Sequence, residues 1–300
     1  MKSTTKKLQR LSATAGLVIG TLLAASSSAQ AASFTSNVSQ NTDPTQDILL
    51  KSITQKHASG RDATFSNFSY VNRVDMTSTI TERNGTTTQL RNEARVAGVA
   101  NSGAASTDRG RNATSPMATN EDPTGAEAAA FLGNNNLNNI IDTEDTGNFV
   151  MNLFFDKMIT QDASGLDNLF FWERGMNSSM MVEAIDAAGR VIGKVVNMNQ
   201  TKRAENAAGF AISTTEIGRS VQQVGSWGLK VSDFGVTSLA GIRVKTDKWS
   251  SGPDFKVIAR GGEFSSTSVP EPGTLLALGI VGGLAFLQRR RKEASLLKQG

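Results

Sequence analysis

Cysteine is absent from this chain of 300 residues, and histidine and tyrosine occur once each. Without cysteine the chain has no disulfide, no thiolate metal site and no cysteine nucleophile. The single histidine, His57, excludes a centre with several histidine ligands and leaves at most one Ser–His–Asp triad. The sequence around His57 is polar and no Gly-x-Ser-x-Gly motif accompanies it, which favours a solvated loop histidine.

The chain as a whole also lacks an excess of acidic residues. Its net positive charge comes from residues at its two ends. The net charge is +4, with 31 basic and 27 acidic residues. Nine basic and two acidic residues belong to the ends, so 22 basic and 25 acidic residues remain for the middle. We therefore predict no nucleic-acid partner. The end residues are Lys2, Lys6, Lys7, Arg10, Glu271, Arg289, Arg290, Arg291, Lys292, Glu293 and Lys298.

The N-terminal end has the three parts of a secretory signal. A basic segment is followed by an apolar stretch over residues 11–25 and then by Ala29-Gln30-Ala31, the small-x-small pattern of a signal-peptidase site. The sequence predicts a signal peptide over residues 1–31, cleaved after Ala31. The alternative is a retained N-terminal helix, but the apolar stretch is short and diluted by Ser and Thr.

The C-terminal end combines a proline-rich tripeptide, an apolar run and a basic cluster. Pro270, Glu271 and Pro272 precede a predicted membrane helix over residues 274–288. The two prolines disfavour helix and keep the tripeptide extended for a processing enzyme. The strictly apolar part spans only about 21 Å, against about 30 Å of hydrocarbon, which indicates a temporary anchor. Arg289, Arg290, Arg291 and Lys292 form a positive-inside cluster, followed by a cytoplasmic tail over residues 293–300.

Residues 269–292 closely resemble the PEP-CTERM sorting signal, because the tripeptide, the helix and the basic cluster occur in that family's order. The resemblance implies that an exosortase is a partner and cuts near Pro270 to Pro272. It also implies an inner-membrane intermediate held by the C-terminal helix. The processed protein would then lie at the cell surface or outside the cell.

The exported part, residues 32–268, is rich in Ser, Thr, Asn and Gly, with short apolar segments. This composition predicts a mainly β fold, a single jelly-roll-like β-sandwich with long polar loops. A single-sheet β-solenoid is the alternative, which the lack of repeats disfavours. Residues 91–125 are predicted to form one long mobile loop, and residues 127–132 a short helix ended by Gly133. Strands are expected at residues 48–53, 64–71, 74–81, 149–159, 169–172, 181–185, 190–196, 209–214, 227–231, 241–245 and 255–259.

The run over residues 168–178 contains Trp172, Glu173, Arg174, Gly175 and Asn177. Together with three later stretches, it resembles cyanobacterial exosortase-dependent surface proteins. This resemblance implies export and surface presentation, and no particular biochemical activity. The later stretches are residues 215–218, 224–228 and 251–257.

Glu173 beside Trp172 is the most enzyme-like element, because paired carboxylates hydrolyse glycosides and burial raises a carboxyl pKa. The alternative is structural: Glu173 and Arg174 are adjacent on a predicted strand, so they point to opposite faces and can pair with neighbouring strands. Trp172, Trp227 and Trp249 form either a sugar platform or part of the core.

Asp142, Glu144 and Asp145 offer hard oxygen ligands for calcium, but their spacing matches no EF-hand, and acidic turns are commonly just solvated. We therefore expect no cofactor, with calcium as the alternative.

The sequence predicts an exosortase-sorted surface or matrix protein that is not an enzyme and that acts by adhesion or by association with extracellular polysaccharide. The absence of a catalytic constellation beside two sorting signals is the basis of this prediction. One alternative is a carbohydrate-active enzyme that uses Glu173. The other is a calcium-dependent, lectin-like binding module.

Overall fold

A computed structural model describes residues 34–261, except 40–42, 58–59, 61, 77–78, 82–86, 90–104, 114–119, 122, 144–148, 162, 200–205 and 247–249. The predicted signal peptide, sorting signal, membrane helix and cytoplasmic tail all lie outside these residues. Within the described part, no helix combines the length and the apolar character that crossing a membrane requires.

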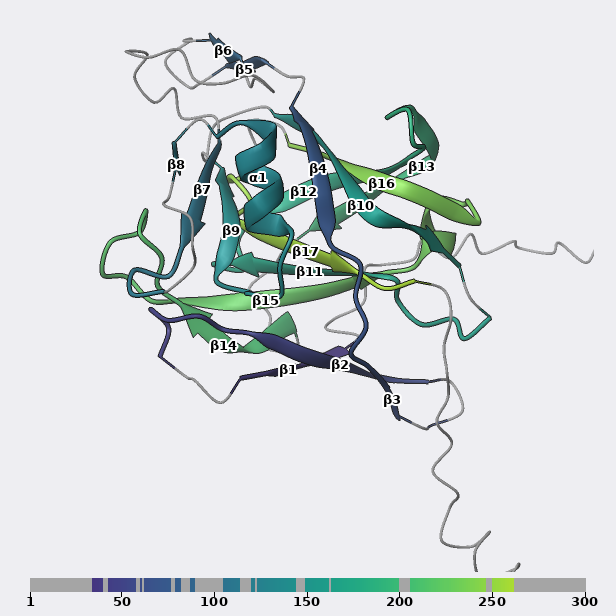
Figure 1. The fold of residues 1–300 in the computed structure, drawn as a ribbon, viewed down its shortest axis with the longest axis horizontal. Helices are drawn as coiled ribbons and strands as arrows, with labels where there is room; N and C mark the ends of the chain where they lie inside the picture. The colour runs from purple at the N-terminus through teal and green to yellow at the C-terminus, as the bar shows by residue number, and fades with distance from the viewer. Residues whose placement is uncertain are drawn as a thin grey trace, which may run out of the picture.

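The fold is mainly β, as the composition predicts, and two large sheets make up most of it (Figure 1). The five-stranded sheet has the order β13 (Val191–Asn199), β12 (Ser179–Ile185), β16 (Ser238–Lys245), β10 (Val150–Thr160) and β4 (Val71–Met76). The seven-stranded sheet has the order β14 (Ala207–Ile212), β15 (Gln222–Leu229), β11 (Leu169–Arg174), β17 (Phe255–Ala259), β9 (Asn139–Thr143), β7 (Ala105–Arg109) and β8 (Asn120–Glu121).

Smaller elements complete the described part. A three-stranded sheet consists of β1 (Phe34–Val38), β2 (Leu50–Lys56) and β3 (Asp62–Phe65), and a hairpin of β5 (Thr79–Thr81) and β6 (Thr87–Gln89). The helix α1 (Gly125–Leu132) begins with a capping box between Thr124 and Glu127 and is capped by Gly133, so the predicted helix is confirmed. A short 3₁₀-helix, η2, spans Val231–Phe234.

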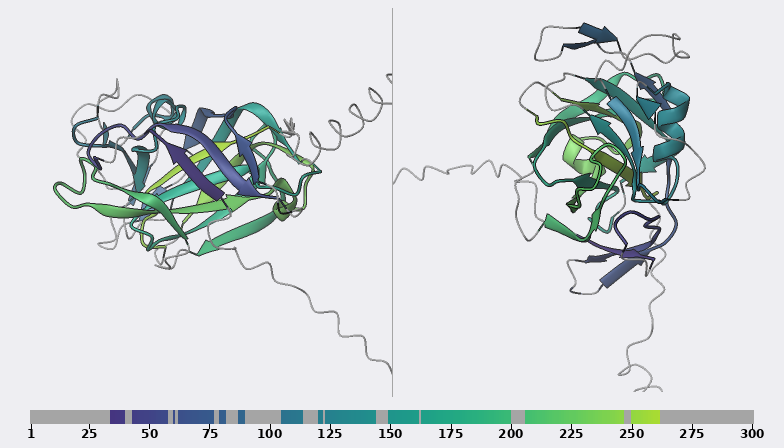
Figure 2. Two further views of the ribbon diagram at one scale, coloured as in Figure 1. Left: turned by 90° about the horizontal axis from the view of Figure 1, so that it is seen from below. Right: turned by 90° about the vertical axis from the view of Figure 1, so that its left-hand side faces the viewer.

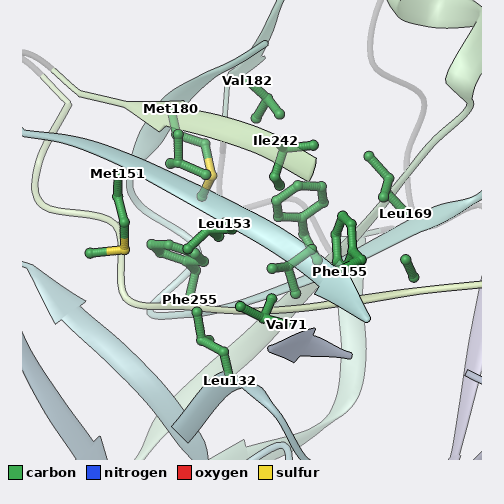
Figure 3. Packing of buried hydrophobic residues seen from close by; sticks show 14 of the residues in the cluster. Val71, Leu132, Met151, Leu153, Phe155, Leu169, Met180, Val182, Ile242 and Phe255 are labelled. Carbon is green, nitrogen blue, oxygen red and sulfur yellow. The ribbon is translucent and has the colours of Figure 1, made fainter. Parts of the chain in front are cut away.

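Two hydrophobic cores lie on opposite faces of the seven-stranded sheet. The first combines residues of the five-stranded and seven-stranded sheets with α1, and Figure 3 shows Leu153, Ile242 and Phe255 among its members. The second combines residues of the seven-stranded and three-stranded sheets, including Ile53 and Trp172. The three-stranded sheet lies below the seven-stranded one in Figure 1 and the views in Figure 2 agree, so it forms a third layer that the sequence did not predict.

The strand β11 shows why the central sheet tolerates an uninterrupted apolar run. Leu169 and Phe171 belong to the first core, whereas Phe170 and Trp172 belong to the second. Side chains of a strand alternate between the two faces of its sheet, so a strand buried on both faces needs apolar residues at every position. All six residues of β11 are buried.

Most predicted strands are present within a few residues of the expected bounds, but the prediction for residues 91–125 is wrong in part. The strand β7 lies inside this range and pairs with β9 along its whole length. Its sequence is Ala-Ser-Thr-Asp-Arg, which lacks the large apolar side chains that mark a buried strand. Ser106, Thr107 and Asp108 are nevertheless buried, so hydrogen bonds and ion pairs take the place of apolar packing.

Candidate functional site

The end of β11 carries the charged pair of residues 173 and 174, and its two side chains lie in different surroundings. Glu173 and Arg174 are both buried, at 0% and 3% exposure. In register, Glu173 lies between Gly225 of β15 and Phe255 of β17. The alternation along β11 continues through this pair, so the two side chains point to opposite faces of the central sheet, as the sequence predicts.

Arg174 is surrounded by three carboxylates from three different parts of the chain. Its guanidinium contacts Asp108 at 2.9 Å, Asp142 at 2.5 Å and Asp254 at 2.8 Å, and it also donates to the hydroxyl of Thr214. Asp108 lies on β7, Asp142 on β9 and Asp254 immediately before β17. One guanidinium thus connects strands that are far apart in the sequence, which is a structural role.

The electrostatics of this cluster follow from three acidic groups sharing one positive charge. Burial raises the pKa of Asp108, against the hydrogen bond from Thr214 and the charge of Arg174. Burial also raises the pKa of Asp254 well above its usual range, and the neighbouring Asp142 adds to the effect. Burial alone would lower the pKa of Arg174, but the charges of Asp254 and Asp142 raise it, so Arg174 stays protonated.

Among the described residues, no basic side chain forms an ion pair with Glu173. Its Oε1 accepts a hydrogen bond of 2.7 Å from the hydroxyl of Ser178, whereas its Oε2 is buried without a hydrogen-bond partner. Burial raises the pKa of Glu173 to about 8. The hydrogen bond from Ser178, the backbone amides of Met176 and Asn177 and the charge of Arg174 oppose this shift. A carboxyl group in this position is protonated at neutral pH and is closed off from substrates in solution.

The loop after β11 has a backbone that favours glycine. Gly175 has a φ of 100°, and a Cβ at this position would lie 2.2 Å from Oδ1 of Asn177. Met176, with a φ of 55°, and Ser251 in the facing loop, with a φ of 53°, are left-handed although neither is glycine. Gly175 and Asn177 therefore set the path of the chain around Glu173.

The remaining aromatic candidates lie in the cores wherever the structure describes them. Trp172 is buried in the second core, and its Nε1 donates a hydrogen bond of 2.9 Å to Ser36 of β1. Trp227 is buried in the first core. The interpretation of these two tryptophans as core residues is confirmed, and they form no exposed platform. Trp249 lies outside the described residues.

Lys256 on β17 is a buried charge that the sequence analysis did not single out. It is completely buried, and its Nζ donates to the carbonyl of Phe131, at 2.6 Å, and to Oδ1 of Asn134, at 3.2 Å. Burial lowers the pKa of Lys256 well below its usual range. The amine holds the C-terminal end of α1 against the central sheet.

A shallow hollow lies on the five-stranded sheet. Its volume is about 290 Å³, and Asn72, Arg73, Phe154, Phe155, Ala187 and Ala240 line it. The guanidinium of Arg73 lies 3.6 Å above the ring of Phe154. An aromatic ring, small aliphatic side chains and an exposed cation can together bind a ligand that has both an apolar and an anionic part.

Several predicted site residues lie outside the described part of the chain. Asp142 is described, but its carboxylate contacts Arg174, and its companions in the predicted calcium site, Glu144 and Asp145, are not described. His57 directly follows β2 and is half-exposed. Also outside are Ala29, Ala31, Pro270, Glu271, Pro272, Arg289, Arg290, Arg291 and Lys292.

Comparison with known proteins assigns one segment of the chain. Residues 268–292 match the model of the PEP-CTERM protein-sorting motif. No curated protein and no solved structure was found to match the chain.

Proposed function

We propose that this chain, which carries a PEP-CTERM protein-sorting motif at residues 268–292, is a non-catalytic surface or matrix protein that associates with extracellular polysaccharide. The motif indicates export across the membrane and exosortase-dependent sorting to the cell surface. This motif is the observation that carries the proposal. The association with polysaccharide is a separate part of the proposal and has its own test below.

The position of the run over residues 168–178 supports a structural role for its residues. Trp172, Glu173 and Arg174 are buried, and Gly175 and Asn177 shape the loop that closes over Glu173. A catalytic carboxylate must reach its substrate, and Glu173 has no exposed surface. We therefore place the function of the domain on its surface.

The sorting route is tested by the intact mass and the location of the protein in its host, with and without the exosortase. We expect the wild-type strain to yield a surface or secreted protein that lacks residues 1–31 and ends near Pro270. The strain without the exosortase should retain the basic C-terminal segment. An identical C-terminus in both strains would contradict the proposal.

Polysaccharide association is tested on protein recovered from the host after export. We expect it to co-sediment with the insoluble envelope polysaccharide of the same host and to leave the pellet when that polysaccharide is digested. A Glu173→Gln variant should behave like the wild type, because Glu173 is buried. Release of reducing ends by the wild type but not by this variant would instead establish the glycosidase alternative.

A further inference from the structure

We propose that the hollow over Phe154 binds a uronic-acid unit of an acidic polysaccharide, with the sugar ring against Phe154 and the sugar carboxylate on Arg73. This inference rests on the proposed polysaccharide association and names its site and its class of ligand. It uses residues of β4, β10 and β16 and of the turn between β12 and β13, none of which takes part in the charged cluster around Arg174.

The hollow exists because β10 loses its regular pairing at this point. Phe154 pairs with Gly241 of β16, but the next pair on this side joins Ile159 to Leu239, so the intervening residues of β10 are unpaired with β16. The register with β4 also shifts between Phe154 and Phe155. A bulged strand bends and leaves space beside it. The neighbours facing this space, Ala187 and Ala240, are too small to fill it.

Phe154 supplies an aromatic ring that lies directly beneath the guanidinium of Arg73. It points away from both cores, since it belongs to neither cluster of buried residues. Phe154 is only 5% exposed, because Arg73 lies over its ring and the turn at Gly189 lies beside it, but the side chain of Arg73 is itself 53% exposed. Arg73 can therefore swing away, and the ring that it uncovers suits the apolar C–H face of a pyranose.

Arg73 supplies a positive charge that, among the described residues, contacts the ring of Phe154 and one carboxylate, that of Asp75. Its ion pair with Asp75 is 3.6 Å long and joins partly exposed side chains, so it contributes little. Arg243 on the same face is held by Asn152, at 2.8 Å, and by the carbonyl of Gly189, at 3.0 Å. The planar guanidinium of Arg73 can bind a carboxylate with two parallel hydrogen bonds, which gives both strength and orientation.

The turn beside the hollow does not bring a competing negative charge. Asp186 accepts hydrogen bonds from Arg190 and from the amide of Ala188, so its carboxylate is directed into its own turn. Asn72 lines the hollow and adds an amide that can bond sugar hydroxyls. A volume of about 290 Å³ is at the small end for ligand sites, which fits one ring of a polymer rather than a long segment.

The experiment compares polygalacturonate with the same polymer after reduction of its carboxyl groups, using protein recovered from the host after export. Calorimetric titration should show binding to polygalacturonate and at least tenfold weaker binding to the reduced polymer. Arg73→Gln should weaken binding to polygalacturonate at least tenfold, and Arg73→Lys should weaken it less. Phe154→Leu should weaken binding to both polymers, with the melting temperature measured to exclude unfolding.

Arg219→Gln is the matched control, because Arg219 is an exposed arginine in the loop between β14 and β15 and its loss changes the net charge equally. It should leave binding unchanged. Equal weakening by Arg219→Gln and Arg73→Gln would overturn the site in favour of general charge attraction. Unchanged binding by Arg73→Gln, with envelope polysaccharide still bound, would overturn the site alone. Failure of the wild type to bind both polygalacturonate and the envelope polysaccharide would overturn the proposed function as well.

Discussion

Glu173 and Arg174 are neighbours on one strand and almost equally buried, yet the fold favours the charged form of Arg174 and the uncharged form of Glu173. Arg174 has three carboxylates around it, and its positive charge is stabilised. Glu173 has neutral neighbours instead, the hydroxyl of Ser178 and the backbone amides of Met176 and Asn177, and its negative charge is suppressed. The comparison teaches that the partners on each face of the sheet, and not the depth of burial, decide the charge state.

Lys256 extends the comparison to the opposite sign. Like Glu173, it is buried beside neutral groups, here a carbonyl and an amide oxygen. Burial therefore pushes the pKa of Lys256 down and that of Glu173 up, so that both groups move toward their uncharged forms.

Removing the charge of Arg174 should have the largest effect. Arg174→Met leaves the carboxylates of Asp108, Asp142 and Asp254 close together without a counter-charge. We expect a loss of about 3–5 kcal/mol in the free energy of unfolding, measured by urea titration at pH 7. If Arg174→Met does not fold, Arg174→Lys replaces it in the experiment. Arg174→Lys should lose less free energy of unfolding, because the positive charge remains. A loss below 1 kcal/mol in Arg174→Met would mean that the cluster does not hold the sheet together.

Removing the ionisable group at Glu173 should stabilise the protein at neutral and alkaline pH. The pKa is about 8 in the folded chain, above its value of 4.5 in the absence of the fold. The folded state thus binds the proton more tightly, and its stability falls as pH rises from 4.5 to 8. Glu173→Gln should abolish this fall and gain on the order of a few kcal/mol at pH 8. Equal slopes in the two proteins would show that Glu173 is ionised in the fold.

Replacing Lys256 should remove a dependence of stability on pH that has the opposite sign to that of Glu173. A lowered pKa in the folded state means that stability falls as pH decreases from 10.5 toward the folded value. Lys256→Met keeps the length of the side chain, loses about 1 kcal/mol of hydrogen bonding at high pH, and should remove this slope. Urea titrations between pH 6 and pH 10, with Lys51→Met on the exposed surface of β2 as control, test the expectation. A slope that survives in Lys256→Met would contradict it.

Removing the hydroxyl of Ser178 should have the smallest effect. Ser178→Ala leaves Oε1 of Glu173 without its 2.7 Å hydrogen bond, which raises the pKa of Glu173 further and costs about 1 kcal/mol. The fall in stability with pH should therefore end at a higher pH than in the wild type. In the Glu173→Gln background the same substitution should no longer move any pH midpoint, which distinguishes a charge effect from a packing effect.

The sequence predicted the strand type and the alternation well because these depend on local pattern. The run from Leu169 to Trp172 indicated a strand, and the adjacent positions of Glu173 and Arg174 indicated opposite faces. The partners of Arg174 were beyond reach, because they depend on the order of strands in the sheet. Asp108 in particular lies on β7, whose polar sequence predicts a loop and whose place between β9 and β8 only the fold reveals.

The candidate sites divide in the same way. The sorting signals are linear motifs, so the sequence alone identified residues 269–292, and the family model agrees. The hollow at Phe154 arises from a break in strand register and from a turn that folds back beside it. The spacing of residues in the sequence predicts neither feature. Lys256 was missed because a single lysine in an apolar strand normally indicates a side chain that faces solvent. Only the fold shows that the second face of this sheet is covered.

The position of β17 has a consequence for the order of events during secretion. This strand is the last of the described chain, yet it lies inside the seven-stranded sheet, between β11 and β9. If the chain crosses the membrane N-terminus first, as the predicted signal peptide implies, it cannot close this sheet until residue 259 is outside. Only residues 260–267 then separate the completed fold from the sorting motif. We therefore expect the chain to stay unfolded in transit, so that folding and presentation of the motif to its processing enzyme occur at nearly the same moment.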